Sequence, residues 1–169
     1  MPIILARIDE RLIHGQVMTS EALVRHKING IIIADRNLVN DPTSQAIFNA
    51  SVLTSDYDIP DGSQYTEPER LHFFLKEKDL PKHRFLVLFR NMAGVLSAIE
   101  NGVILNSLNL GNFISIDPLK KELTRSFQVG HTESEELKKL HWLIGEMYFN
   151  DLGNPNTPYS PQKHAWENK

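Results

Sequence analysis

Residues 3–17 read IILARIDERLIHGQV, and this stretch decides the class of fold. It opens on a continuous apolar run, Ile3 to Ala6, in which no polar residue alternates with the apolar ones. Strands covered on both faces have this composition, whereas strands with one wet face alternate. A polar segment then leads to His14 and Gly15, after which apolar residues recur at helical spacing. The stretch therefore predicts a buried strand, a polar turn and a helix in succession.

The same order of apolar run and helix recurs along the chain. Ile31–Ala34 and Phe85–Phe89 are two more continuous apolar runs, which predict further buried strands. Helix start signals, apolar stripes or both occur in four segments: Asp41-Pro42 with Ala46, Ile47, Ala50 and Leu53; Thr66 to Glu69 with Leu71, Phe74 and Leu75; Met92, Val95, Leu96 and Ile99 before Gly102; and Thr132 to Glu135 with Leu137, Leu140 and Ile144. This alternation predicts an α/β fold, an open and mainly parallel sheet with helices on both faces.

A chain of 169 residues suits one domain with a sizeable core. The periodic pattern ends near residue 150, so we expect the domain to cover residues 1–150. Residues 151–169 are polar and rich in proline, which predicts a mobile tail. Residues 116–128 have no clear period and predict a loop with a short strand.

The composition is that of an ordinary globular protein, with 41% hydrophobic and 23% charged residues. The net charge of -3 argues against a general binder of nucleic acid or membrane surfaces. Because the chain has no cysteine, it has no disulfide, thiolate nucleophile or cysteine zinc site. Its apolar runs are too short to span a bilayer, so we expect a soluble, cytoplasmic protein.

Candidate chemistry gathers at the carboxyl ends of the predicted strands, where open parallel sheets bind ligands. Arg7 and Arg11 follow the first apolar run, Asp35 and Arg36 follow the second, and Arg90 follows the run at 85–89. Four arginines on one edge of a net acidic protein predict a local anion site, because a guanidinium is a forked donor for phosphate or carboxylate oxygens.

His14 is the candidate nucleophile at this edge. Its imidazole, with an ordinary pKa of ~6.5, can attack phosphorus near neutral pH. Gly15 and Gln16 begin the next predicted helix, whose free N–H groups can hold an anion. With Arg7 and Arg11 beside them, these are the parts that phosphoryl transfer needs. The residues by themselves leave open a capping or surface role for the histidine.

Other chemistries lack their motifs. The remaining histidines have no metal-ligand spacing, and neither a nucleotide-binding glycine loop nor a serine nucleophile elbow is present. We therefore expect neither a metal nor a cofactor.

Residues 5–17 resemble the opening of the enzyme IIB component of the mannose/fructose/sorbose family of the bacterial phosphoenolpyruvate-dependent sugar phosphotransferase system. Weaker support comes from Ile31–Asp35, Leu86–Asn91 and Ser107–Gly111, which stand in the same order as in that family. The resemblance covers residues 1–150.

The resemblance implies a phosphocarrier. His14 would take a phosphoryl group on its Nδ1 atom from a phosphohistidine of the IIA partner. It would pass the group to a sugar bound by the membrane IIC and IID components, at the inner face of the membrane. Arg7 and Arg11 match arginines of the family's phosphorylation site, and Asp9 between them would orient an arginine or His14.

The sequence departs from the family pattern at three places. Glu21 stands where tryptophan is common, Arg90 where a small polar residue is common, and Asn112-Phe113 where Gly-Met is usual. Arg90 is predicted to add a contact to the phosphate or the partner. These departures leave open the sugar (N-acetylgalactosamine, mannose, fructose or sorbose) and the docking surface. The sequence also leaves open whether the chain forms a homo-oligomer.

Two other functions stay open. One is a regulatory binding module on the same fold that no longer transfers phosphate. The other is a stand-alone enzyme with a phosphohistidine intermediate, such as a small phosphatase or mutase, which would need a general acid from Asp9 or Glu10.

Overall fold

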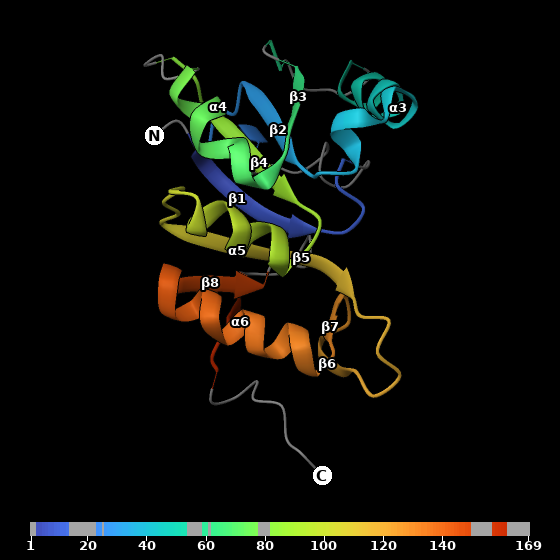
Figure 1. Ribbon diagram of the computed structural model, residues 1–169, viewed down its shortest axis with the longest axis vertical. Helices are drawn as coiled ribbons and strands as arrows, with labels where there is room; N and C mark the ends of the chain where they lie inside the picture. Colours follow the sequence, from blue (N-terminus) through green and yellow to red (C-terminus); the bar gives the residue numbers. More distant parts are fainter. Residues whose placement is uncertain are drawn as a thin grey trace.

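The described strands form one mostly parallel sheet with β1 at its centre (Figure 1). The computed structural model describes residues 3–13, 23–24, 26–53, 59–60, 62–77, 82–149 and 157–161. Within them the strands are β1 (Ile3–Asp9), β2 (Gly30–Ala34), β3 (Ser63–Thr66), β4 (Phe85–Phe89), β5 (Ser107–Ile114), β6 (Lys121–Thr124), β7 (Phe127–Val129), β8 (Glu146–Phe149) and β9 (Thr157–Pro158). The longer helices are α3 (Pro42–Leu53), α4 (Leu71–Glu77), α5 (Met92–Glu100) and α6 (His131–Ile144), and the short 3-10 turns are η1 (Leu38–Asn40) and η2 (Pro68–Arg70).

Strand order runs β3-β2-β4-β1-β5-β7-β6, and β8 also pairs with β5. The pairs among β3, β2, β4, β1 and β5 are parallel, so their carboxyl ends lie along one edge of the sheet. Antiparallel pairing occurs in the β6–β7 hairpin and between β8 and β9. The predicted open, mainly parallel sheet is confirmed.

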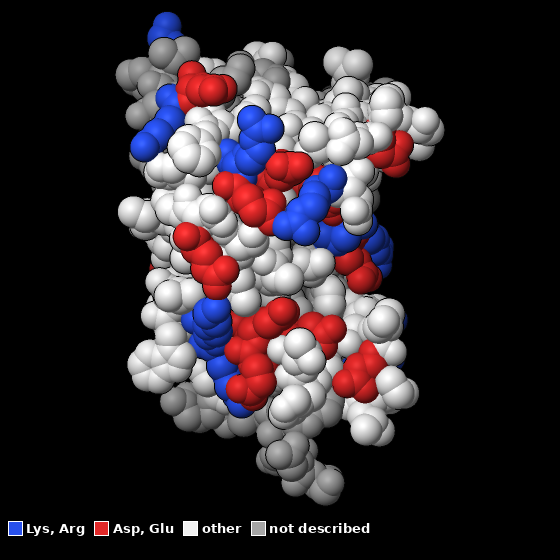
Figure 2. Space-filling view, in the orientation of Figure 1, with Lys and Arg blue, Asp and Glu red and all other residues white. Residues whose placement is uncertain are grey.

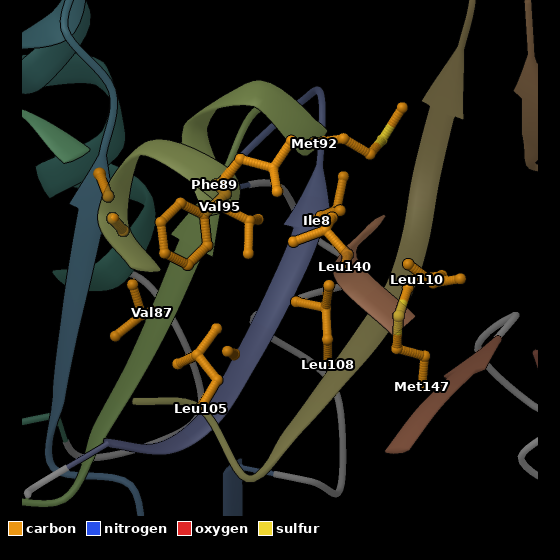
Figure 3. Close-up of a cluster of buried hydrophobic side chains, with 14 of the residues drawn as sticks. Ile8, Val87, Phe89, Met92, Val95, Leu105, Leu108, Leu110, Leu140 and Met147 are labelled. Atoms are coloured by element: carbon orange, nitrogen blue, oxygen red, sulfur yellow. The ribbon is translucent and has the colours of Figure 1, made fainter. Parts of the chain in front are cut away.

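Helices cover both faces of this sheet, as predicted. Successive residues of a strand point to opposite faces. Ile32 and Val87 therefore join the apolar cluster that packs against α4, α5 and α6, which Figure 3 shows around Phe89. Ile31 and Leu86 join a second cluster, which includes Val52 of α3. Burying each such side chain contributes about 1.5–3 kcal/mol, which explains the uninterrupted apolar runs.

The α3 helix begins where the sequence predicts, but it buries a different stripe. Asp41 caps it, since its carboxylate accepts a hydrogen bond from the Ser44 N–H at 3.1 Å. The predicted stripe is wrong: Ile47 is 62% exposed and Leu53 is 86% exposed. Val52 is the buried residue of α3 and packs in the second apolar cluster. The helix therefore turns a different side towards the sheet from the one predicted.

Two predicted capping boxes are also misplaced. Thr66 ends strand β3, its hydroxyl donates to the Glu67 carbonyl oxygen at 3.3 Å, and the N-cap of the following turn η2 is Glu67. The N-cap of α6 is Gly130 rather than Thr132. Glu133 does reach back to the cap, accepting from the Gly130 N–H at 3.0 Å.

Part of the C-terminal segment that the sequence predicts to be mobile packs against the domain. Thr157 and Pro158 form β9, which pairs with Phe149 and Tyr148 of β8. Tyr159 is 4% exposed and makes edge contacts with the rings of His141 and Phe149. Residues 157–161 thus pack on the domain, whereas the mobility of residues 151–169 stays a prediction.

The buried position of Tyr159 predicts a specific loss of stability at high pH. Burial, with a smaller contribution from the charge of Glu135, raises the pKa of Tyr159 to about 12 from its ordinary value of 10.0. The contribution of the neutral phenol to stability is complete below pH 10 and is lost as the pH rises towards 12. Urea unfolding at pH 9 and pH 11.5 should therefore show a larger loss for the wild type than for Tyr159→Phe. Equal losses of stability in the two proteins would show that Tyr159 is not the source of the loss.

No helix in the described ranges is long and apolar enough to cross a membrane.

Candidate active site

The strand register brings the predicted site residues together at the carboxyl edge. Ile8 of β1 pairs with both Phe89 of β4 and Leu110 of β5, and Ala34 of β2 pairs with the same Phe89. These four residues form one row across the sheet. The residues that follow the row on each strand are Asp9, Asp35, Arg90 and Gly111.

Asp9 and Arg7 form a buried ion pair at the end of β1. The Arg7 side chain is 8% exposed and that of Asp9 is 0% exposed. Arg7 donates from Nε and Nη2 to Oδ2 of Asp9 at 3.1 and 3.0 Å, and from Nη1 to Oδ1 of Asn109. Charges this deep are tolerated only when paired and hydrogen-bonded. Arg7 is thus held by the protein and turned away from solvent.

A glycine makes room for the Arg7 guanidinium. Ile8 pairs with Leu110 and Asp9 with Asn112, so Gly111 is an extra residue in β5, as in a β-bulge. A Cβ atom on Gly111 would lie well under 3.0 Å from Cζ, Nη2 and Nε of Arg7. The guanidinium therefore packs directly on the β5 backbone at this point.

Asp9 also starts a tight turn that leads towards His14. Its Oδ1 accepts from the Arg11 N–H at 3.2 Å, and its carbonyl oxygen accepts from the Leu12 N–H at 2.9 Å. Leu12 has a left-handed backbone with φ of 57°, which is uncommon for a residue with a branched side chain. Leu12 and Ile13 are buried in the second apolar cluster, so the turn is fixed on both sides of Arg11.

Arg11 is the exposed cation of this turn. The Asn112 side chain bridges Glu10 and Arg11. Its amide nitrogen, turned towards Glu10, donates to Glu10 Oε1 at 3.1 Å, and its amide oxygen accepts from Arg11 Nη2 at 3.2 Å. The Glu10 N–H donates to the Asn112 carbonyl oxygen at 2.8 Å. Asn112, one of the departures from the family pattern, therefore holds both residues of the turn against β5.

Arg90 holds the turn from the side of β4. Its Nε forms an ion pair with Oδ2 of Asp35, and its Nη1 donates to the Glu10 carbonyl oxygen at 3.1 Å. Asp35 is buried and also accepts from the N–H groups of Asn37 and Leu38 at 2.8 and 3.2 Å.

The predicted cluster of four arginines differs from an open anion site. Arg7 pairs with Asp9, Arg90 with Asp35 and Arg36 with Glu69, which also accepts from the Ser97 hydroxyl. Acidic and basic side chains are likewise interspersed on the face in Figure 2. Carboxylates thus offset three of the four positive charges, and Arg11 is the most accessible guanidinium beside the turn.

His14, Gly15, Gln16 and Glu21 lie outside the described residues, so their predicted roles stay predictions. His14 follows Ile13 directly in the chain, and Ile13 is buried at the end of the fixed turn.

Asn109 and Gly111 have no predicted role in the sequence, although both contact Arg7. A polar Asn and a Gly inside an otherwise apolar run are the signals that could have identified them. Asn109 Nδ2 is buried and finds no hydrogen-bond partner among the described residues.

The charge of Arg7 reaches β8 as well. Burial and the Glu146 charge raise the pKa of Tyr148, while the Arg7 charge and a hydrogen bond to Ser107 oppose that rise. Across the described ranges, no three His, Asp or Glu side chains form a group that could hold a metal ion.

Known proteins share this arrangement of elements. Residues 3–146 match the family model described as PTS system sorbose subfamily IIB component. The chain is 27% identical over 143 residues to the PTS system fructose-specific EIIB component of Bacillus subtilis, covering 83% of this chain and 82% of that one. It is 28% identical over 142 residues to the PTS system sorbose-specific EIIB component of Klebsiella pneumoniae, covering 83% and 81%. The crystal structure of the IIBSor domain of the sorbose permease from Klebsiella pneumoniae superimposes with a TM-score of 0.78 at 25% identity, covering 93% of each chain.

Proposed function

Because the chain belongs to the sorbose subfamily of IIB components of the phosphotransferase system, a family of phosphocarriers that act as sugar phosphotransferases in sugar uptake, we propose that it carries the phosphoryl group on His14. The family interacts in general with IIA proteins and with membrane IIC and IID components. For this chain, the donor is a phosphorylated IIA partner, and the acceptor is a sugar held by the membrane components at the inner face of the membrane.

One observation carries the proposal: the buried Asp9 carboxylate fixes the turn that ends one residue before His14. It binds Arg7 through one oxygen and the Arg11 N–H through the other. Phosphoryl transfer depends mainly on positioning and on stabilising charge, so a rigid turn beside an exposed arginine supports this chemistry.

In each transfer step, one bond to phosphorus forms as another one breaks. Nδ1 of His14 forms a bond to phosphorus as the bond from phosphorus to the IIA histidine nitrogen breaks. A sugar hydroxyl oxygen then forms a bond to phosphorus as the bond from phosphorus to Nδ1 breaks, and the hydroxyl proton ends on the imidazole that is released, directly or through water. Neither step needs an oxidant, a reductant or a cofactor.

The site residues have different roles. Arg11, which is exposed, contacts the phosphoryl oxygens, together with the N–H groups of Gly15 and Gln16. Arg7 positions Asp9 instead of touching phosphate, because its guanidinium is buried against Asp9, Asn109 and Gly111. Asp9 in turn positions Arg11 through the backbone.

The similarities favour no single sugar. The chain is 27% identical to a fructose-specific relative and 28% identical to a sorbose-specific one, and this difference is too small to separate them.

Labelling from phosphoenolpyruvate tests the proposal. The protein is incubated with phosphoenolpyruvate, enzyme I, HPr and an active IIA protein without sugar, and its intact mass and the acid lability of the label are read. We expect one acid-labile phosphoryl group on the wild type and none on His14→Ala.

His26→Ala is the matched control, since His26 is an exposed histidine beyond the opposite ends of the strands. It should be labelled like the wild type. An unlabelled wild type, or a label that persists in His14→Ala, would overturn the assignment.

A further inference from the structure

Arg90 connects three neighbouring strands at the carboxyl edge. It follows β4 directly, forms an ion pair with Asp35 beyond the end of β2, and donates from Nη1 to the Glu10 carbonyl oxygen beyond the end of β1. Its planar guanidinium can bind both acceptors at once, which a single point charge cannot do as well.

Asp35 makes this connection rigid. Its side chain is 4% exposed, and its Oδ1 accepts from the N–H groups of Asn37 and Leu38, which leaves Oδ2 for Arg90. The Arg90 side chain, though 39% exposed, is therefore anchored to a buried carboxylate.

The contact between Arg90 and Glu10 restrains the turn from a second side. The Glu10 N–H is bound from the β5 side by the Asn112 carbonyl oxygen, and the Glu10 carbonyl oxygen is bound from the β4 side by Arg90. With both groups held, the peptide that joins Glu10 to Arg11 has a fixed orientation. That orientation sets the direction in which Arg11 and the residues after it leave the sheet.

We infer that Arg90 is a positioning residue for phosphoryl transfer: it orients the turn before His14 through the Glu10 carbonyl oxygen and does not contact the phosphoryl group. This inference rests on the proposed role of His14. It differs from a direct phosphate or partner contact, because Asp35 already binds the Arg90 charge.

Single-turnover transfer from a phosphorylated IIA protein separates the two roles. A misplaced turn lowers the maximum rate, by about tenfold to a hundredfold, without changing the half-saturating IIA concentration. Arg90→Gln should show this pattern. Arg90→Lys should show it too, since it keeps the charge but lacks the planar fork of donors that binds Asp35 and Glu10 together. Asp35→Asn, which weakens the anchor while leaving Arg90 in place, should lower the maximum rate in the same direction.

Arg84→Gln is the matched control, because Arg84 precedes β4 at the opposite edge of the sheet, where its Nε donates to the His26 carbonyl oxygen at 2.9 Å. It should transfer at the wild-type rate. All rates are measured where urea unfolding shows each variant to be folded, so that loss of structure is not counted as loss of positioning.

Three results would overturn the inference while leaving His14 as the acceptor: a wild-type maximum rate in Arg90→Gln, a rise in half-saturating IIA concentration alone, or full recovery in Arg90→Lys. The last two would identify a charge contact with the partner or the phosphate. An unlabelled wild type would instead remove the proposed function, and it is read before any variant is compared.

Discussion

Replacing Asp9 with asparagine is expected to lower the free energy of unfolding by about 3–5 kcal/mol, because it leaves the buried Arg7 charge without its counterion. The carboxylate accepts hydrogen bonds through both oxygens, from Arg7 on one side and from the Arg11 N–H on the other. An asparagine has one oxygen, so its NH₂ group must face a donor on one of those sides. Urea unfolding of wild type and Asp9→Asn measures the loss, and labelling at His14 should fall with it.

Two comparisons give this prediction its specificity. Glu135→Gln removes an acid from the exposed pair with Lys138 and should leave the urea midpoint close to that of the wild type, because solvent screens exposed pairs. The double variant Arg7→Met/Asp9→Asn should be more stable than Asp9→Asn alone, since the unpaired charge is gone. If Asp9→Asn were as stable as the wild type, the buried pair would not be holding the turn.

Gly111→Ala is expected to lower the free energy of unfolding by about 3 kcal/mol, because the new methyl group overlaps the Arg7 guanidinium. The guanidinium cannot move aside without breaking its bonds to Asp9 and Asn109. In an Arg7→Met background the same substitution should be less harmful, which a double-mutant cycle on unfolding free energies measures.

Gly94→Ala is the matched control for this substitution. Gly94 lies in α5, and a Cβ atom there would meet its nearest neighbour at 3.5 Å, an ordinary contact distance. Alanine is favoured over glycine in a helix by about 0.5–1 kcal/mol, so this variant should be at least as stable as the wild type. An equal loss in both variants, or additive losses for Arg7 and Gly111, would show that the overlap is not the cause.

The sequence predicts those strands whose own residues are buried. Ile31–Ala34 and Phe85–Phe89 have continuous apolar runs because helices cover both faces of β2 and β4. β3 is missing from the prediction, since Ser63–Thr66 has only one apolar residue. It is a strand because the exposed edge of β2 offers four paired positions to it. β9 likewise depends on its partner β8 and on the fit of Tyr159, neither of which is visible in its two residues.

The sequence likewise predicts only part of the candidate site. Arg7, Asp9 and Arg11 could be identified because they lie in one short motif. The partners that decide what each arginine does could not, since Asn109 is 102 residues from Arg7 and Asp35 is 55 residues from Arg90. Sequence spacing therefore suggested a group of free cations, whereas the strand register places a carboxylate beside three of them.

The short β9 strand also affects whether two copies of the chain can associate through a sheet edge. A strand at the edge of a sheet presents unpaired N–H and C=O groups, which can pair with a strand of another copy and start aggregation. β8 pairs with β5 on one side and with β9 on the other, so Tyr148 and Phe149 do not offer a bare edge. A chain cut before Thr157 would uncover that edge together with the ring of Phe149, against which Tyr159 packs. The pairing of β9 with β8 therefore covers an edge that would otherwise be open to a strand of a second copy.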